Sequence, residues 1–182
     1  DVTVDCGSGP QKITPSPFRE TGTGWFIDSN GWIITNGHVV QPAHELPRWV
    51  ENDQAQKGVV LACGAALARS LPKVELKPSL FILAANGFRL PAKIAKYSPP
   101  VGGGAMSGRD LALLQVEAAE MPAFSLGKSQ GLKLGDPLRI LGFPGVVLTH
   151  ELLNSTAKVE ASVTSGAVSG FKQDVSNQAV IQ

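Results

Sequence analysis

Two short apolar runs flank the dipeptide Asn30-Gly31 near the start of the chain. The runs are Trp25-Phe26-Ile27 and Trp32-Ile33-Ile34, and their aromatic and β-branched residues favour strands. Asn-Gly between two such runs predicts a β-hairpin with a type I′ turn, because that turn needs positive φ at both central residues. We expect the rest of the fold to be organised around this hairpin.

The second strand of the predicted hairpin runs into Thr35-Asn36-Gly37-His38. The sequence therefore predicts His38 at the end of a strand, where an imidazole can be held rigidly at the edge of a cleft. A histidine in such a place is more often structural than catalytic, since catalytic groups are a minority of ionisable residues. His38 becomes a candidate only if other parts of the chain supply partners for it.

The composition fits a globular protein with many short strands and tight turns. Of 182 residues, 43% are apolar, and 20 Gly and 13 Pro supply turns. A net charge of +1 offers no strong electrostatic attraction to nucleic acid or to an anionic membrane. The longest apolar run, residues 59–68, is ten residues long and too short to span a bilayer.

Neither a metal site nor a cofactor is predicted. The two cysteines, Cys6 and Cys63, are 57 positions apart and cannot form a zinc site alone. They can be either disulfide-bonded or free and buried, and the sequence leaves both alternatives open. His44-Glu45 is followed by a proline at position 47, which disfavours a zinc-binding helix, and His150 stands alone.

Strand patterns recur along the rest of the chain. Residues 1–20, rich in Gly and Pro, read as an irregular arm, and residues 41–78 read as a partly helical insertion. Taken together, the predicted strands indicate an all-β fold of the sandwich or barrel type. A turn is expected at residues 164–166. Beyond the hairpin, strands are predicted at residues 80–83, 88–94, 111–116, 138–143, 158–164, 167–171 and 179–181.

Asp110 directly precedes the apolar run of residues 111–116. An aspartate beside a histidine fixes the imidazole tautomer and stabilises the imidazolium that forms when the ring accepts a proton. Taken alone, Asp110 is more typical of a turn. The order His38, then Asp110, with a serine later, is one of the known chain orders of the Ser-His-Asp triad.

Four ordered motifs resemble trypsin-like serine proteases of the HtrA/Deg type. Residues 21–40 resemble the catalytic-histidine region of that family, and residues 109–114 resemble its catalytic-aspartate motif. Residues 126–145 and 162–170 resemble the first strands of its second barrel. Four motifs in the right order are far more specific than any one of them.

The resemblance implies an all-β, trypsin-like double β-barrel with the second barrel incomplete. Together with the arm (1–21) and the insertion (about 41–78) read from the residues, it divides the chain into a first barrel (22–118) and a partial second barrel (119–182). The implied activity is hydrolysis of peptide bonds in protein or peptide substrates, with His38 as general base and Asp110 orienting it. The resemblance also implies an extracytoplasmic location and assembly into homotrimers, without a cofactor.

The chain departs from the family in two respects. The insertion is longer than the family leads us to expect, and we hypothesise that it rims the cleft; a surface insertion without a role is the alternative. The family's Gly-Asn-Ser-Gly-Gly motif, which carries the nucleophile, is expected only beyond Gln182, so residues 1–182 are predicted to be inactive. Ser129, in a Gly-x-Ser-x-Gly pattern, and Ser107 are poor substitutes, because the nucleophile elbow needs a strand before it and a helix after it.

Two other interpretations stay open at this stage. The chain can be a non-catalytic, protease-like module that binds partners or peptides. It can also be one piece of a cleaved protease held together with its other half.

Overall fold

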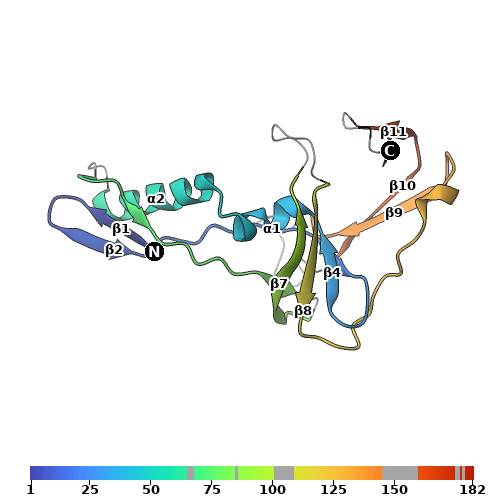
Figure 1. The fold of residues 1–182 in the computed structure, drawn as a ribbon, viewed down its shortest axis with the longest axis horizontal. Helices are drawn as coiled ribbons and strands as arrows, with labels where there is room; N and C mark the ends of the chain where they lie inside the picture. Colours follow the sequence, from blue (N-terminus) through green and yellow to red (C-terminus); the bar gives the residue numbers. More distant parts are fainter. Residues whose placement is uncertain (65–67, 85, 101–108, 145–159, 175–176, 178) are drawn as a thin grey trace. The chain divides into compact units, whose positions relative to one another are not determined.

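The computed structural model spans the whole chain, and two compact units can be distinguished in it (Figure 1). Unit 1 comprises residues 1–20 and 40–80, and unit 2 comprises residues 21–39 and 81–182. The boundary at residue 40 falls inside helix α1 (Gly37–His44). The structure describes residues 1–64, 68–84, 86–100, 109–144, 160–174, 177 and 179–182.

The described part of unit 1 contains a small sheet with a helix packed against it. Strand β1 (Val2–Asp5) pairs antiparallel with both β2 (Pro10–Ile13) and β5 (Lys73–Val74). Helix α2 (Arg48–Cys63) buries Val50, Gln54 and Gly58, which recur every four residues and so share one face. A Cβ at position 58 would lie 2.7 Å from the side chain of Val2, so glycine allows the helix to approach the sheet closely.

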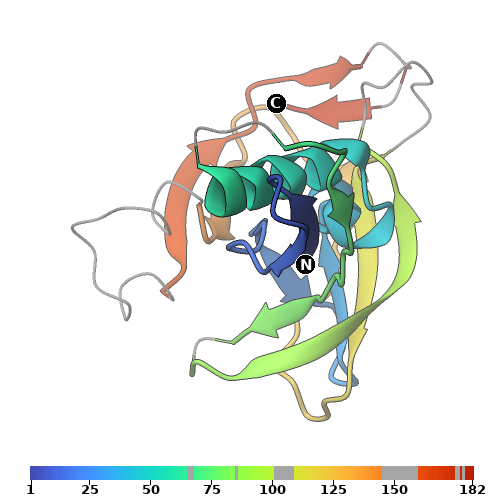
Figure 2. The same cartoon turned by 90° about the vertical axis from the view of Figure 1, so that its left-hand side faces the viewer.

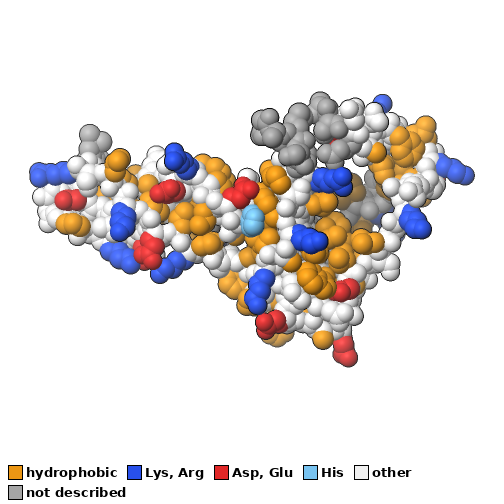
Figure 3. Space-filling model, in the orientation of Figure 1, with side chains coloured by type: hydrophobic (Ala, Val, Ile, Leu, Met, Phe, Trp, Pro, Cys, Tyr) orange, Lys and Arg blue, Asp and Glu red, His pale blue; other side chains and the backbone are white. Residues whose placement is uncertain are grey.

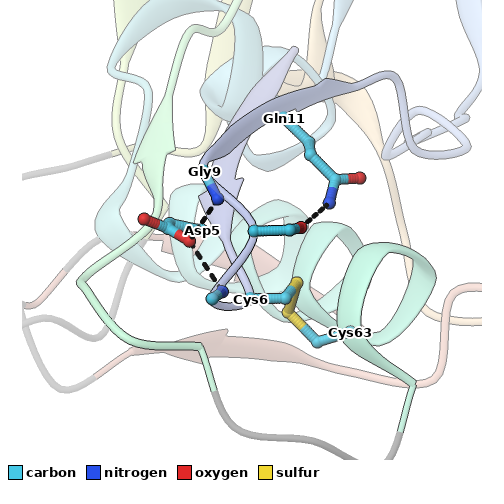
Figure 4. The surroundings of a disulfide bond; sticks show 7 residues. Asp5, Cys6, Gly9, Gln11 and Cys63 are labelled. Atoms are coloured by element: carbon cyan, nitrogen blue, oxygen red, sulfur yellow. Dashed lines mark hydrogen bonds between the residues drawn. A yellow bond between two sulfur atoms is a disulfide. The ribbon is translucent and has the colours of Figure 1, made fainter.

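A disulfide joins Cys6 to Cys63 and ties the β1–β2 turn to the end of α2 (Figure 4). In the turn, the Asp5 carboxylate accepts the backbone N–H groups of Gly7 (2.7 Å) and Gly9 (3.2 Å). Of the two alternatives that the sequence leaves open, bonded or free cysteines, the structure shows the disulfide. It also corrects the expectation of an irregular arm, because β1 and β2 form regular strands there.

Unit 2 contains a curled sheet with the strand order β3-β4-β8-β7-β6 within the described residues. Figure 2 shows the long strand β7 curving along this sheet. The described buried side chains at its centre include Ile33, Ala112, Leu114 and Val116. The strands are β3 (Gly24–Phe26), β4 (Trp32–Thr35), β6 (Phe81–Leu83), β7 (Arg89–Ser98) and β8 (Leu111–Val116).

The predicted hairpin is present, but its turn is not of the predicted type. β3 pairs antiparallel with β4, and Gly31 has a positive φ of 88° whereas Asn30 does not have a positive φ. Instead, the Asp28 carboxylate accepts the N–H groups of Asn30 (3.0 Å) and Trp32 (3.1 Å). A side chain that caps its own turn allows a wider connection than the two-residue type I′ turn.

In its described residues, the C-terminal part of unit 2 contains two antiparallel ladders. β9 (Pro137–Gly142) pairs with β10 (Ser162–Ala167), and β11 (Phe171–Gln173) pairs with β12 (Ala179–Ile181). The predicted turn at residues 164–166 is wrong, because these residues pair with residues 138–140 inside the β9–β10 ladder. Backbone pairing overrides the turn propensity of Ser-Gly there.

The predicted fold class is confirmed: the chain is mostly β, with a curled half-barrel sheet and a partly helical insertion after His38. Among the described helices, none combines the length and the apolar character that a membrane crossing requires. Lys and Arg side chains lie among Asp and Glu on the face drawn in Figure 3, in keeping with the net charge of +1.

Candidate active site

The sheet of unit 2 brings His38 and Asp110 together. β4 and β8 are antiparallel neighbours, and their register pairs Thr35 with Ala112. The chain that leaves β4 after Thr35 therefore lies beside the chain that enters β8 at Leu111. His38 follows the first strand and Asp110 precedes the second, so residues that are 72 positions apart meet at one end of the sheet.

His38 belongs to a helix and not to a strand end. β4 ends at Thr35, and His38 is the second residue of α1. The prediction that His38 ends a strand is therefore wrong, because it missed the change of backbone conformation at Gly37. The practical result is similar, because a helix that begins directly after a buried strand also restricts the imidazole.

Two hydrogen bonds join His38 to the carboxylate of Asp110. The backbone N–H of His38 donates to Oδ1 at 2.8 Å, and the ring atom Nδ1 lies 2.8 Å from Oδ2. An ionised carboxylate only accepts hydrogen bonds, so Nδ1 carries the proton in this contact and Nε2 is left with the lone pair of the neutral ring. The arrangement prepares Nε2 to act as a base.

The backbone around Asp110 is shaped for this contact. Asp110 has a φ of 50°, in the left-handed region that few residues other than glycine adopt, and its N–H donates to the Pro99 carbonyl at 3.0 Å. A Cβ at Gly37 would collide with the Ser98 carbonyl oxygen and would lie 3.3 Å from Asp110 Oδ1. Glycine at position 37 therefore allows the two backbone segments to approach each other.

The electrostatics keep Asp110 ionised. Partial burial raises the pKa of the Asp110 carboxyl, but the backbone N–H and ring of His38, with a smaller contribution from the Asn36 amide, lower it more. The net pKa lies below the ordinary value for aspartate. The side chain of His38 is 54% exposed and that of Asp110 is 25% exposed, so solvent and a ligand can reach the imidazole.

The other candidate residues add no described partner to this pair. Ser129 lies in the short 3-10 helix η1 (Ser129–Gly131), so the strand and helix of a nucleophile elbow are not formed around it. Ser107 and His150 lie outside the described residues. Within the part of the chain that the structure describes, no three His, Cys, Asp or Glu side chains are grouped to hold a metal ion.

Asn36 is the residue that the sequence reasoning passed over. Its side-chain amide contacts Asp110 at two atoms, although the motif Thr35-Asn36-Gly37-His38 drew attention only to the histidine. The available signal was its position directly after a buried strand, where a short amide can reach a neighbouring strand start.

The comparisons with known proteins identify the family. A family profile described as "Trypsin-like peptidase domain" matches residues 22–182. The chain therefore belongs to the trypsin-like peptidase family.

Curated relatives define the type more closely. A protein of Hahella chejuensis, described as a probable periplasmic serine endoprotease DegP-like, is 26% identical over 172 residues, which are 94% of this chain and 25% of that protein. A protein of Pseudomonas fluorescens with the same description is 25% identical over 174 residues, 93% of this chain and 25% of that protein. The resemblance to HtrA/Deg-type proteases is confirmed, and the chain spans about a quarter of the length of these relatives.

The fold is also similar to that of a solved structure. The HtrA-type protease AlgW with a tripeptide has a TM-score of 0.50 and is 18% identical, over 96% of this chain and 36% of that one. At this identity the similarity concerns the fold alone.

Proposed function

We propose that this chain supplies the base and its orienting carboxylate to a serine endopeptidase site. His38 is the general base and general acid of the proposed triad, and Asp110 orients it. The observation that carries the proposal is the contact of 2.8 Å between His38 Nδ1 and Asp110 Oδ2, in a chain that belongs to a peptidase family. The exposure of the imidazole supports it further.

The proposed reaction uses Nε2 of His38 twice. Nε2 accepts the proton of the serine hydroxyl while the serine oxygen bonds to the carbonyl carbon of the substrate. The imidazolium then donates that proton to the nitrogen of the leaving amine as the C–N bond breaks, and a water molecule repeats the sequence to release the acid. Asp110 stays ionised throughout and stabilises the imidazolium, which is consistent with its lowered pKa.

The serine is proposed to come from outside residues 1–182. The family's Gly-Asn-Ser-Gly-Gly motif does not occur within this sequence, and no substitute is built at Ser129. Without the nucleophile and the backbone N–H groups beside it, residues 1–182 alone are expected to be inactive.

Peptide or protein substrates and an extracytoplasmic location complete the proposal. The curated relatives are described as periplasmic, and the AlgW structure holds a tripeptide. The disulfide between Cys6 and Cys63 supports an oxidising compartment, because disulfides persist there and are reduced in the cytosol.

The test compares the native full-length protein with two variants. Asp110→Asn is expected to lower kcat for an unstructured protein substrate about 10⁴-fold, because the ring loses the acceptor that fixes its tautomer. His38→Ala is expected to lower kcat by about 10⁴-fold or more, because it removes the base. His44→Ala, a second histidine of the same helix, is the matched control and is expected to retain full activity.

A fluorophosphonate probe separates the proposal from its alternative. The full-length protein is expected to form a covalent adduct, whereas residues 1–182 are expected to form none. Hydrolysis that survives both His38→Ala and Asp110→Asn would contradict the proposal. A full-length protein that binds peptide but forms no adduct would instead be a protease-like binding module.

A further inference from the structure

Asn36 makes contact with Asp110 through a single atom. Its side-chain Nδ2 donates to the backbone carbonyl oxygen of Asp110 and to the carboxylate oxygen Oδ2, each at 3.3 Å. An amide nitrogen carries two hydrogens, so it can make both bonds at once. One short side chain therefore holds the main chain and the side chain of the same aspartate.

The position of Asn36 aims this amide at Asp110. Thr35, directly before it, is 4% exposed and donates its hydroxyl to the Thr23 carbonyl at 2.7 Å. Gly37, directly after it, lies against the Ser98 carbonyl so closely that a Cβ would not fit. The backbone is fixed on both sides of Asn36, and the side chain needs little freedom to reach its partner.

Asp110 needs such support more than an ordinary aspartate does. Its φ of 50° places it in a region that costs an L-residue free energy unless its surroundings hold it there. The described donors to its carboxylate are the N–H of His38, the ring of His38 and Asn36. Asn36 is the one among these that does not belong to His38, so it can hold the carboxylate while the imidazole changes its protonation.

We propose that Asn36 is a positioning residue, whose amide fixes the backbone and the carboxylate of Asp110 so that Oδ2 faces His38. It acts through Asp110 and does not touch the reacting atoms. The role of Asn36 in catalysis rests on the proposed function. Its hydrogen bonds to Asp110 can be tested in residues 1–182 without an activity assay. His38 is the ionisable side chain that the described contacts place against this carboxylate.

Two substitutions of Asn36 are expected to shift the pKa of Asp110 by different amounts. A general loss of structure would not produce this graded difference. Asn36→Ala removes the donor, and Asn36→Asp keeps the shape but turns an oxygen toward Oδ2. Hydrogen bonds to an ionised carboxylate lower its pKa, and a like charge raises it. The pKa of Asp110 is therefore expected to rise in Asn36→Ala and to rise further in Asn36→Asp.

The experiment follows the carboxyl carbon of Asp110 by ¹³C NMR as a function of pH, with amide spectra to verify the fold. Asn30→Ala and Asn30→Asp are matched controls: Asn30 is an exposed asparagine of the same unit, and its hydrogen bond to Asp28 uses the backbone N–H. Both controls are expected to leave the titration of Asp110 unchanged. A titration of Asp110 that is the same in the wild type and in Asn36→Ala overturns the proposal, as does an equal response in the Asn30 variants.

Kinetics of the full-length protein add an independent readout. Loss of one hydrogen bond of ordinary strength is expected to lower kcat about fivefold in Asn36→Ala with KM unchanged, because the effect acts on the base and not on substrate binding. An unchanged kcat, or a change in KM alone, overturns the positioning role. If instead His38→Ala retains activity, the proposed function fails while the NMR result on Asn36 still stands.

Discussion

Units 1 and 2 differ in what holds them together. In unit 1 the described buried apolar side chains include Val2, Val4 and Val50, and the disulfide closes a segment of 57 residues. Both cysteines of the chain lie in unit 1, so unit 2 depends on the packing of its curled sheet around residues such as Ile33 and Leu114. Because a small core buries little apolar surface, we expect the cross-link to contribute substantially to the stability of unit 1.

Charge pairs do not change this contrast. Unit 1 has ion pairs of 2.8 Å between Lys12 and Asp1 and between Lys57 and Asp53, with partly to largely exposed side chains. Exposed pairs contribute little to the free energy of unfolding because water and salt screen them. We therefore expect unit 2 to depend on the packing of its sheet, and unit 1 to depend on its disulfide in addition to its small core.

The largest effect is expected from removing that bond. The double variant Cys6→Ser, Cys63→Ser should lower the free energy of unfolding of unit 1 by about 4 kcal/mol, the loop-closure entropy of a segment of this length. Hydrogen exchange resolved by residue should show lost protection in β1, β2 and α2, with little change in β4 and β8. An equal loss of protection in both units would contradict the contrast between them.

Leu114→Ala should give the reverse pattern. Leu114 is 1% exposed at the centre of the unit 2 sheet, and its truncation leaves a cavity worth about 3 kcal/mol. Denaturant melts and hydrogen exchange should show the loss in β4, β7 and β8. Leu134→Ala is the matched control, since Leu134 is 66% exposed in the same unit and should change the free energy of unfolding by less than about 0.5 kcal/mol.

The sequence predicted the sheet of unit 2 better than the sheet of unit 1. Alternation of apolar and polar residues identified β7, and apolar runs identified β6 and β8. Alternate residues are buried in β8, whereas β6 and most of β7 alternate between half-buried and exposed residues. β1 and β2 lie among glycines and prolines, and β1 pairs with β5 about 70 residues later. A local pattern does not reveal pairing at that distance.

The sequence predicted that Asp110 orients His38, but it did not predict the geometry that joins them. His38 and Asp110 could be named from their motifs, and the register of β4 and β8 supplies the contact between them. The positive φ of Asp110 and the reach of Asn36 depend on how two segments meet at the sheet end. Such features follow from tertiary geometry. For Asn36 the sequence offers only its position directly after a buried strand, and for the φ of Asp110 residue spacing carries no signal.

The smallest expected effect is the loss of folding stability at low pH, to which a carboxylate of each unit contributes. The pKa of Asp110 in unit 2 is lowered by His38 and Asn36 against partial burial, and the pKa of Asp53 in unit 1 is lowered by Lys57 and Gln54. A lowered pKa in the folded state adds stability above the unfolded-state pKa, about 3.9 for aspartate. That stability is lost as the pH falls through the lower pKa of the folded state, so both units should weaken below about pH 4.

Added salt should distinguish the contribution of Asp53 to this pH dependence from that of Asp110. The carboxylate of Asp53 is held by a partly exposed lysine, so about 0.5 M salt should remove most of the acid sensitivity that it gives to unit 1. The carboxylate of Asp110 is held at 2.8 Å by the backbone N–H of His38, a fixed dipole that salt screens less, so its contribution in unit 2 should persist. Denaturant melts between about pH 2 and pH 6, compared with those of Asp110→Asn and Asp53→Asn, measure both. Salt could instead abolish the difference in acid sensitivity between the wild type and Asp110→Asn. That result would mean that solvent-exposed charge alone holds the carboxylate of Asp110, as it holds the surface ion pairs of unit 1.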